Sequence, residues 1–238
     1  MSSNEEDPIS KAFLGLAECE IETNKVEKKI EEYRLTQLKP IYTKRDEIIS
    51  NIPGFWKIVL SQHNDFANYI RASDFKYIDN IESIKIDWIN SNNFHIIIKF
   101  QGIRDDFPEQ TIAKKCQRII KEESDDLDED IEEQIISEKS EIVWPKSYNH
   151  INPELIEDKT TKEGKKNYRM GMKSFFGWFK WTGLKPGKEF PHGDGLIQLI
   201  VDDLYPYCVR YYTEAQRDLA DEASDSGSSE DEPLDLQE

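Results

Sequence analysis

Apolar side chains recur at steps of three and four along the N-terminal part of the chain, between residues 9 and 52. The row consists of Val26, Ile30, Tyr33, Gln37, Ile41, Lys44 and Ile48, and the other faces are rich in Glu and Lys. This period predicts one long amphipathic helix, which would reach on the order of 60 Å. The rest of the chain is too small to cover such a stripe. We therefore predict a homodimeric coiled coil that buries Val26, Ile30, Tyr33, Gln37, Ile41 and Ile48.

Pro40 lies inside this predicted helix. Because proline lacks a backbone donor, we expect a kink or a local break at that point. A hairpin of two shorter helices, split at Pro40, is the alternative to a dimer. No Gly, Asn or Asp surrounds Pro40 to make a turn, which favours the dimer. The helix is predicted to end at Ile52-Pro53-Gly54.

A β-hairpin is predicted after a shorter helix over Phe55–Ile70. Apolar residues alternate with polar ones over 84–88 and again over 94–100, and the turn-forming run Asn90–Asn93 separates the two segments. This alternation is typical of two strands with one apolar face. We expect later helices to cover that face.

The remaining segments are predicted from composition. The acidic run 122–141 predicts a solvated loop or a polar helix, and Glu141–Trp144 a short strand. The basic run Lys159–Lys173 predicts a mobile loop, and Ser174–Trp181 a dense aromatic cluster. A Gly- and Pro-rich loop over Leu184–Gly195 should lead into a last helix that bends near Pro206.

The chain is strongly acidic, with 48 Asp and Glu against 31 Lys and Arg and a net charge of -17. Such a surface repels nucleic acid and anionic membranes, and it attracts basic partners. No basic residue follows Arg217, so we expect residues 218–238 to form a disordered acidic tail.

Motifs for catalysis are absent from the sequence. It contains no GxxxxGK[ST], GxGxxG, GxSxG or HExxH, and its three cysteines form no CxxC pair. His192-Gly193-Asp194-Gly195 is interpreted as a glycine-rich connection with Asp194 as a helix N-cap, rather than as a metal or phosphate loop. No targeting segment or membrane-length apolar run is visible. We predict an intracellular protein that is not an enzyme and holds no metal or cofactor.

Three ordered motifs resemble the nucleosome assembly protein family, in its SET branch. They are the helix end with Lys39-Pro40, Lys44-Arg45 and Ile52-Pro53-Gly54-Phe55-Trp56, then Ser174-Phe175-Phe176-Gly177-Trp178-Phe179, and then Asp202-Asp203-Leu204-Tyr205-Pro206 followed by Tyr211-Tyr212. The resemblance implies the α+β fold of that family. In it a long dimerisation helix precedes an "earmuff" domain, whose small antiparallel sheet is covered by helices. The expected division is a flexible N-terminus at 1–8, the dimerisation helix at 9–52, the earmuff at 53–217 and the tail at 218–238.

The same resemblance implies a nuclear histone chaperone that is also present in the cytoplasm. It would bind H3–H4, with the H2B-containing histone dimer as the second candidate, and present H3 to a histone acetyltransferase. No membrane and no sequence-specific DNA contact is expected. Charge alone selects the candidate histone-binding residues, which are Asp202, Asp203, Asp218, Asp221, Glu222, Asp225, Glu230, Asp231 and Glu232. An acidic coiled-coil scaffold without histone specificity is the alternative function.

Overall fold

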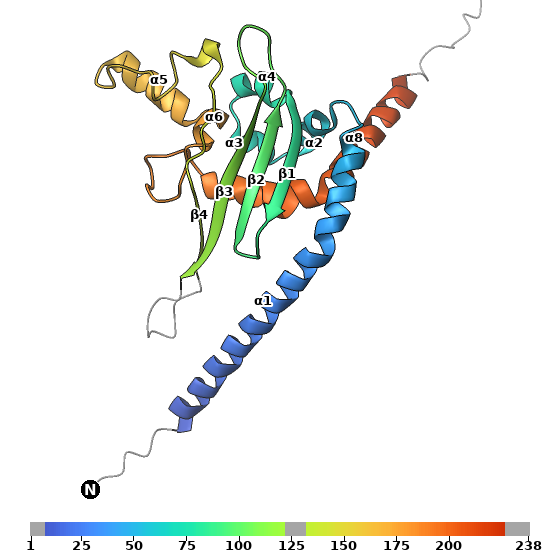
Figure 1. Cartoon of the computed structure of the whole chain (residues 1–238), viewed down its shortest axis with the longest axis vertical. Helices are drawn as coiled ribbons and strands as arrows, with labels where there is room; N and C mark the ends of the chain where they lie inside the picture. The colour runs from blue at the N-terminus through green and yellow to red at the C-terminus, as the bar shows by residue number, and fades with distance from the viewer. Residues whose placement is uncertain (1–7, 122–131, 227–238) are drawn as a thin grey trace, which may run out of the picture.

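The computed structural model describes residues 8–121 and 132–226 and has the predicted α+β architecture (Figure 1). One long helix, α1 (Pro8–Ile49), leads into a domain with a four-stranded antiparallel sheet in the order β1-β2-β3-β4. The strands are β1 (Ile81–Trp88), β2 (Asn93–Phe100), β3 (Gln110–Lys121) and β4 (Glu132–Ser137). The shorter helices are α2 (Phe55–Gln62), α3 (Phe66–Tyr69), α4 (Phe75–Ile78), α5 (Lys162–Met172), α6 (Phe175–Trp178) and α7 (Gly193–Gln198). A π-helical segment (Leu199–Leu204) joins α7 to the last helix, α8 (Tyr205–Ser226).

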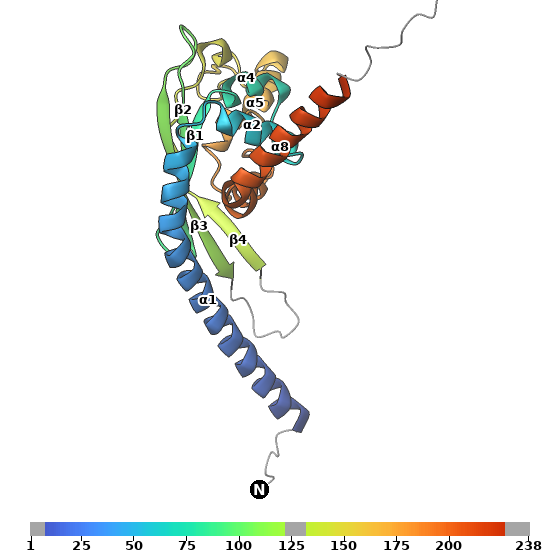
Figure 2. The same ribbon diagram turned by 90° about the vertical axis from the view of Figure 1, so that its right-hand side faces the viewer.

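Helix α1 passes through Pro40 without interruption. The predicted local break is therefore wrong, and so is the alternative of a helical hairpin. Figure 2 shows α1 as one curved rod, in which a missing backbone donor is accommodated by gradual bending. The exposed part of α1 projects away from the domain, and only its C-terminal end packs against the sheet (Figure 1).

The predicted β-hairpin is confirmed, because β1 and β2 pair antiparallel with Trp88 opposite Phe94. Along β2 the residues Phe94, Ile96, Ile98 and Phe100 are buried, and those between them are half-buried. Figure 2 shows α2, α4, α5 and α8 gathered on one side of the sheet. The hydrophobic core thus lies in a single layer between the sheet and these helices.

The aromatic segment 174–181 forms the centre of that core, as the sequence predicts. Phe175, Phe176 and Trp178 are at most 1% exposed. The Asp74 carboxylate fixes the start of α6, because it accepts hydrogen bonds from the Ser174 hydroxyl at 3.2 Å and the Phe175 amide at 2.9 Å. Burial raises the pKa of Asp74 despite these donors.

Other predicted elements differ from the structure. The helix expected over Phe55–Ile70 is divided into α2 and α3. Most of the basic run Lys159–Lys173, predicted as a mobile loop, forms helix α5 (Lys162–Met172). Glu141–Trp144 is extended but is not a strand, because Val143 bonds the side chain of Gln110 and not a neighbouring backbone. Part of the acidic run 122–141 pairs with β3 as strand β4, and residues 122–131 lie outside the described residues.

Lys114 is fully buried in β3 and its ammonium donates to the backbone carbonyls of Glu138, Phe179 and Trp181, at 3.4, 3.3 and 2.8 Å. Burial lowers the pKa of Lys114 to about 8. These three bonds tie β3 to the loop before Glu141 and to the end of the aromatic segment.

We expect Lys114 to make folding stability rise with pH. Between about pH 8 and its ordinary pKa, the unfolded chain binds the lysine proton while the folded chain does not, so higher pH favours the folded state. Relative to Lys114→Met, the wild type should gain roughly 2 kcal/mol of unfolding free energy from about pH 7 to 9.5. Urea unfolding of both proteins at each pH measures the difference. A constant difference across this range would contradict the prediction.

Candidate functional site

The first candidate site is the apolar row of α1. Val26, Ile30, Tyr33, Ile41 and Ile48 have between 54% and 68% of their surface exposed. Gln37 in the same row is also exposed. Further apolar residues are exposed nearer the N-terminus of the helix, namely Ile9, Phe13, Leu14, Leu16 and Ile21. An apolar surface this long is uncommon on a soluble monomer and is typical of an interface.

A cluster at the C-terminal end of α1 fixes this helix to the domain. The Arg45 guanidinium donates to the Tyr205 carbonyl at 2.7 Å, and the Tyr205 hydroxyl donates to Asp46 Oδ2 at 2.8 Å. Arg45 also lies over the rings of Tyr42 and Tyr205, 4.5 and 4.2 Å from their centroids. Because these contacts join the start of α8 to α1, they set the direction in which both helices leave the domain.

Two of the motifs that resemble the nucleosome assembly protein family meet at this cluster. Trp56, from the helix end, stacks parallel to Tyr205 with ring centroids 6.5 Å apart. Phe55 stacks on Tyr212 at 4.8 Å. The sequence pattern alone gives these residues no role, and only the fold shows that they pack against each other.

Asp203 is the most enclosed of the acidic candidates whose side chains the structure describes. Its carboxylate accepts hydrogen bonds from the Tyr211 hydroxyl at 2.8 Å and, with the ring nitrogen protonated, from His63 Nε2 at 3.1 Å. Partial burial acts to raise the pKa of Asp203, but these donors and nearby Arg210 outweigh it and lower the pKa below its ordinary value. Asp203 is therefore an anion that already has partners within the chain.

Asp202 and Asp218 are more accessible. Asp202 forms an ion pair with Arg118 at 2.6 Å, and its side chain is half-exposed. Asp218 Oδ2 accepts a hydrogen bond from the Gln62 amide at 3.0 Å. Asp221 is also exposed on α8. A cationic partner would have to compete with Arg118 for Asp202. At Asp218 it would displace only the neutral side-chain amide of Gln62.

The C-terminal acidic segment begins on a helix. α8 continues to Ser226, so residues 218–226 are helical and not disordered as the sequence predicted. Glu222 and Asp225 belong to this helix, but the positions of their side chains are not described. Glu230, Asp231 and Glu232 lie outside the described residues. Figure 2 shows the end of α8 projecting beyond the domain, and the side chains of Asp218 and Asp221 on this helix are exposed to solvent.

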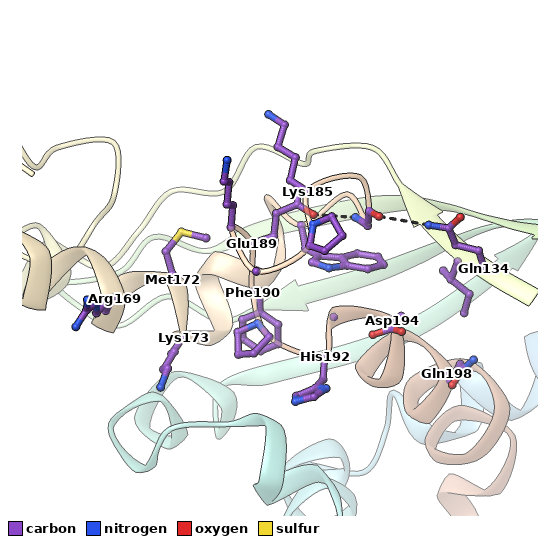
Figure 3. Close-up of a pocket in the computed structure, with 18 of the residues that line it drawn as sticks. Gln134, Arg169, Met172, Lys173, Lys185, Glu189, Phe190, His192, Asp194 and Gln198 are labelled. Atoms are coloured by element: carbon purple, nitrogen blue, oxygen red, sulfur yellow. Dashed lines mark hydrogen bonds between the residues drawn. The ribbon is translucent and has the colours of Figure 1, made fainter.

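A pocket of about 580 Å³, lined by both polar and apolar side chains, lies between α5, the loop at 183–192 and the start of α7 (Figure 3). His192 and not Asp194 is the N-cap of α7, and its side chain makes no capping bond. Gly193 lies so close to Trp181 that an added Cβ would be 2.6 Å from the indole ring, which explains the glycine. The His192–Gly195 run thus has a packing role.

The part of the chain that the structure describes contains no group of three or more His, Cys, Asp or Glu side chains placed to hold a metal ion. Among the same residues, no helix combines the length and apolar character needed to cross a bilayer.

Comparisons with known proteins agree on one kind of relative, although no family model matches the chain. The chain is 55% identical to vacuolar protein sorting-associated protein 75 of Saccharomyces cerevisiae, over 97% of this chain and 89% of that protein. It is 31% identical to a protein of Schizosaccharomyces pombe that is named as a nucleosome assembly protein, over 96% and 87% of the two chains. The crystal structure of the Vps75 histone chaperone superposes with a TM-score of 0.77 at 53% identity and covers 87% of this chain and 99% of that one.

Proposed function

We propose, from the premise that this chain belongs to the nucleosome assembly protein family of histone chaperones, that it binds core histones and shields their positive charge during nucleosome assembly. The observation that carries the proposal is the acidic end of α8. This helix starts at the Arg45 and Tyr205 anchor and extends into solvent with Asp218 and Asp221 exposed. It thus holds negative charge in a fixed direction, on a chain whose net charge is -17.

The physical requirement for a chaperone is tight but releasable binding. Histones bind DNA largely through phosphate contacts, whose strength falls steeply with salt. Exposed carboxylates each contribute only about 0.2–1 kcal/mol, so many must act together and each is easily replaced by a phosphate. The acidic residues of α8 and of the segment beyond it match this requirement.

The proposal includes a homodimer formed through the apolar row of α1. Pairing would bury Val26, Ile30, Tyr33, Gln37, Ile41 and Ile48, which are all exposed in the single chain. It would also bring two acidic α8 helices onto one body. Two linked weak surfaces bind a common partner far more tightly than either surface alone.

The finer parts of the proposal rest on the family resemblance. They are a preference for H3–H4 over the H2B-containing dimer, the presentation of H3 to a lysine acetyltransferase, and residence in the nucleus as well as the cytoplasm. Competition between the two histone pairs for the full-length chain tests the first part. An excess of unlabelled H3–H4 should displace the labelled H2B-containing dimer from the chain. The same excess of unlabelled H2B-containing dimer should displace less of the labelled H3–H4.

The direct test is titration of labelled H3–H4 with the full-length chain at several NaCl concentrations, together with light scattering after gel filtration. We expect saturable binding that weakens as salt rises, and a mass of two chains without histone. An acidic scaffold without histone specificity would bind lysozyme, a basic control protein, as tightly as it binds histones. That result would refute the proposed function.

A further inference from the structure

Helix α5 has two sharply different faces. Gly164 and Gly171 are buried, and an added Cβ would collide with the carbonyl oxygens of Asp158 and Ile151, respectively. The missing side chains let the helix lie directly on the 151–158 segment. The Thr161 hydroxyl caps the start of the helix by accepting from the Gly164 amide at 3.0 Å. These contacts leave only the opposite face free.

Five cationic side chains occupy that free face, and all are at least partly exposed. They are Lys162, Lys165, Lys166, Arg169 and Lys173. At about 100° per residue, they fall within an arc of about 100° whose centre lies opposite the two glycines. We call this face the α5 ridge. None of the five forms an ion pair with another described residue.

The surroundings of the α5 ridge add further positive charge. Arg71 donates to the Met170 carbonyl at 3.2 Å, which places its guanidinium beside the end of the helix. Lys185 and Lys188 are exposed on the loop across the pocket from Arg169, as Figure 3 shows for Lys185. Figure 1 shows α5 far from the exposed part of α1 and from the acidic end of α8. The chain therefore separates its basic surface from its acidic one.

We propose that the α5 ridge binds the phosphate backbone of double-stranded DNA, without sequence preference. From residue 162 to residue 173 the ridge is about 16 Å long. A duplex carries one negative charge per about 1.7 Å of its axis when both strands are counted, so phosphates on the two sides of a groove lie within reach of the five cations. Lysine dominates the ridge, and lysine contacts phosphate as a point charge instead of reading bases. Single-stranded nucleic acid needs exposed aromatic platforms, but Tyr168 is half-buried with Lys159 over its ring.

The net charge of -17 does not prevent this contact. At physiological salt, charges more than about 8 Å away are largely screened, whereas cations in direct contact with phosphate are not. The acids nearest the ridge in the sequence are Glu157, Asp158 and Glu163. Asp158 is turned toward Thr160, whose amide and hydroxyl donate to its Oδ1 at 2.7 and 2.6 Å.

Fluorescence anisotropy with a labelled duplex of about 20 base pairs tests the proposal at NaCl concentrations from about 50 to 200 mM. The ridge variant changes Lys162, Lys166, Arg169 and Lys173 to Gln in the full-length chain. Its matched control changes four exposed lysines on other elements to Gln, namely Lys28, Lys85, Lys139 and Lys146. We expect the ridge variant to bind DNA at least about tenfold more weakly than the wild type. The slope of log affinity against log salt concentration should become shallower by roughly 3–4. The control should change the DNA affinity by less than about twofold.

The same two variants are titrated with H3–H4, so that failure of this proposal and failure of the proposed function can be told apart. The ridge variant should keep wild-type histone affinity. Absence of DNA binding by the wild type, or an equal loss in both variants, would overturn the proposal. So would a ridge variant with unchanged DNA affinity but weaker self-association, because the ridge would then bind acidic residues of a second copy.

Discussion

A chain with Ile30→Asp and Ile41→Asp is expected to be a monomer at concentrations where the wild type is a dimer. Both side chains are about 60% exposed in the single chain and lie in the row proposed to pair. Burying one isoleucine side chain contributes about 2 kcal/mol. Each of the two chains loses two isoleucines, so the interface loses roughly 8 kcal/mol before any penalty for buried carboxylates. This corresponds to more than a 10⁵-fold rise in the dissociation constant. Light scattering after gel filtration measures the mass directly.

The matched control is Asn24→Asp with Thr43→Asp, which adds the same charge to α1 away from the apolar row. Both residues are exposed. This control should remain a dimer. Circular dichroism of the Ile30 and Ile41 variant should still show a folded domain, because the core between the sheet and the helices contains neither residue. Dimeric behaviour of that variant would place the interface elsewhere on the chain.

Strong hydrophobic patterns in the sequence predicted the elements they belong to. The period of α1 and the alternation over 84–88 and 94–100 appear in the structure as a long helix and a hairpin. The aromatic segment at 174–181 forms the core for the same reason, because burial of so many rings dominates the free energy locally. In these regions local pattern and tertiary packing favour the same structure.

Other elements were missed because tertiary contacts override their composition. β3 carries Lys114 at a core position, which breaks the apolar alternation, and the carbonyls that satisfy its ammonium come from distant segments. α5 contains Gly164 and Gly171, which normally disfavour a helix. They are needed here for close contact with the 151–158 segment, and only the fold shows that contact.

Composition alone also fails to distinguish the acidic candidates from one another. Charge alone selected Asp203 together with Asp218, but the structure gives them different surroundings. Asp203 accepts from His63 and Tyr211 and so helps to hold α2 against α8, whereas Asp218 lies on the projecting part of α8. A test of histone binding by charge removal should therefore leave Asp203 intact, and it should also leave Asp202 with its partner Arg118.

Neutralising seven of the nine acids from residue 218 onward is expected to weaken histone binding by about 100-fold at physiological salt. The variant changes seven residues to Asn or Gln, namely Asp218, Asp221, Glu222, Asp225, Glu230, Asp231 and Glu232. If each exposed carboxylate contributes about 0.4 kcal/mol, the loss is roughly 3 kcal/mol, which gives that factor. The salt dependence of binding should also become shallower, because fewer charge pairs are broken on dissociation.

The control for this variant has the same net charge but keeps the C-terminal acids. It neutralises seven acids of the domain that are at least partly exposed, namely Glu82, Asp105, Glu109, Glu138, Glu141, Glu154 and Glu157. Long-range attraction depends on total charge and affects both variants equally, so only a contact surface at α8 and beyond can separate them. Titration of labelled H3–H4 should find the control within about threefold of the wild type. Equal weakening in both variants would mean that histones respond to the overall charge of the chain and not to the acidic end of α8.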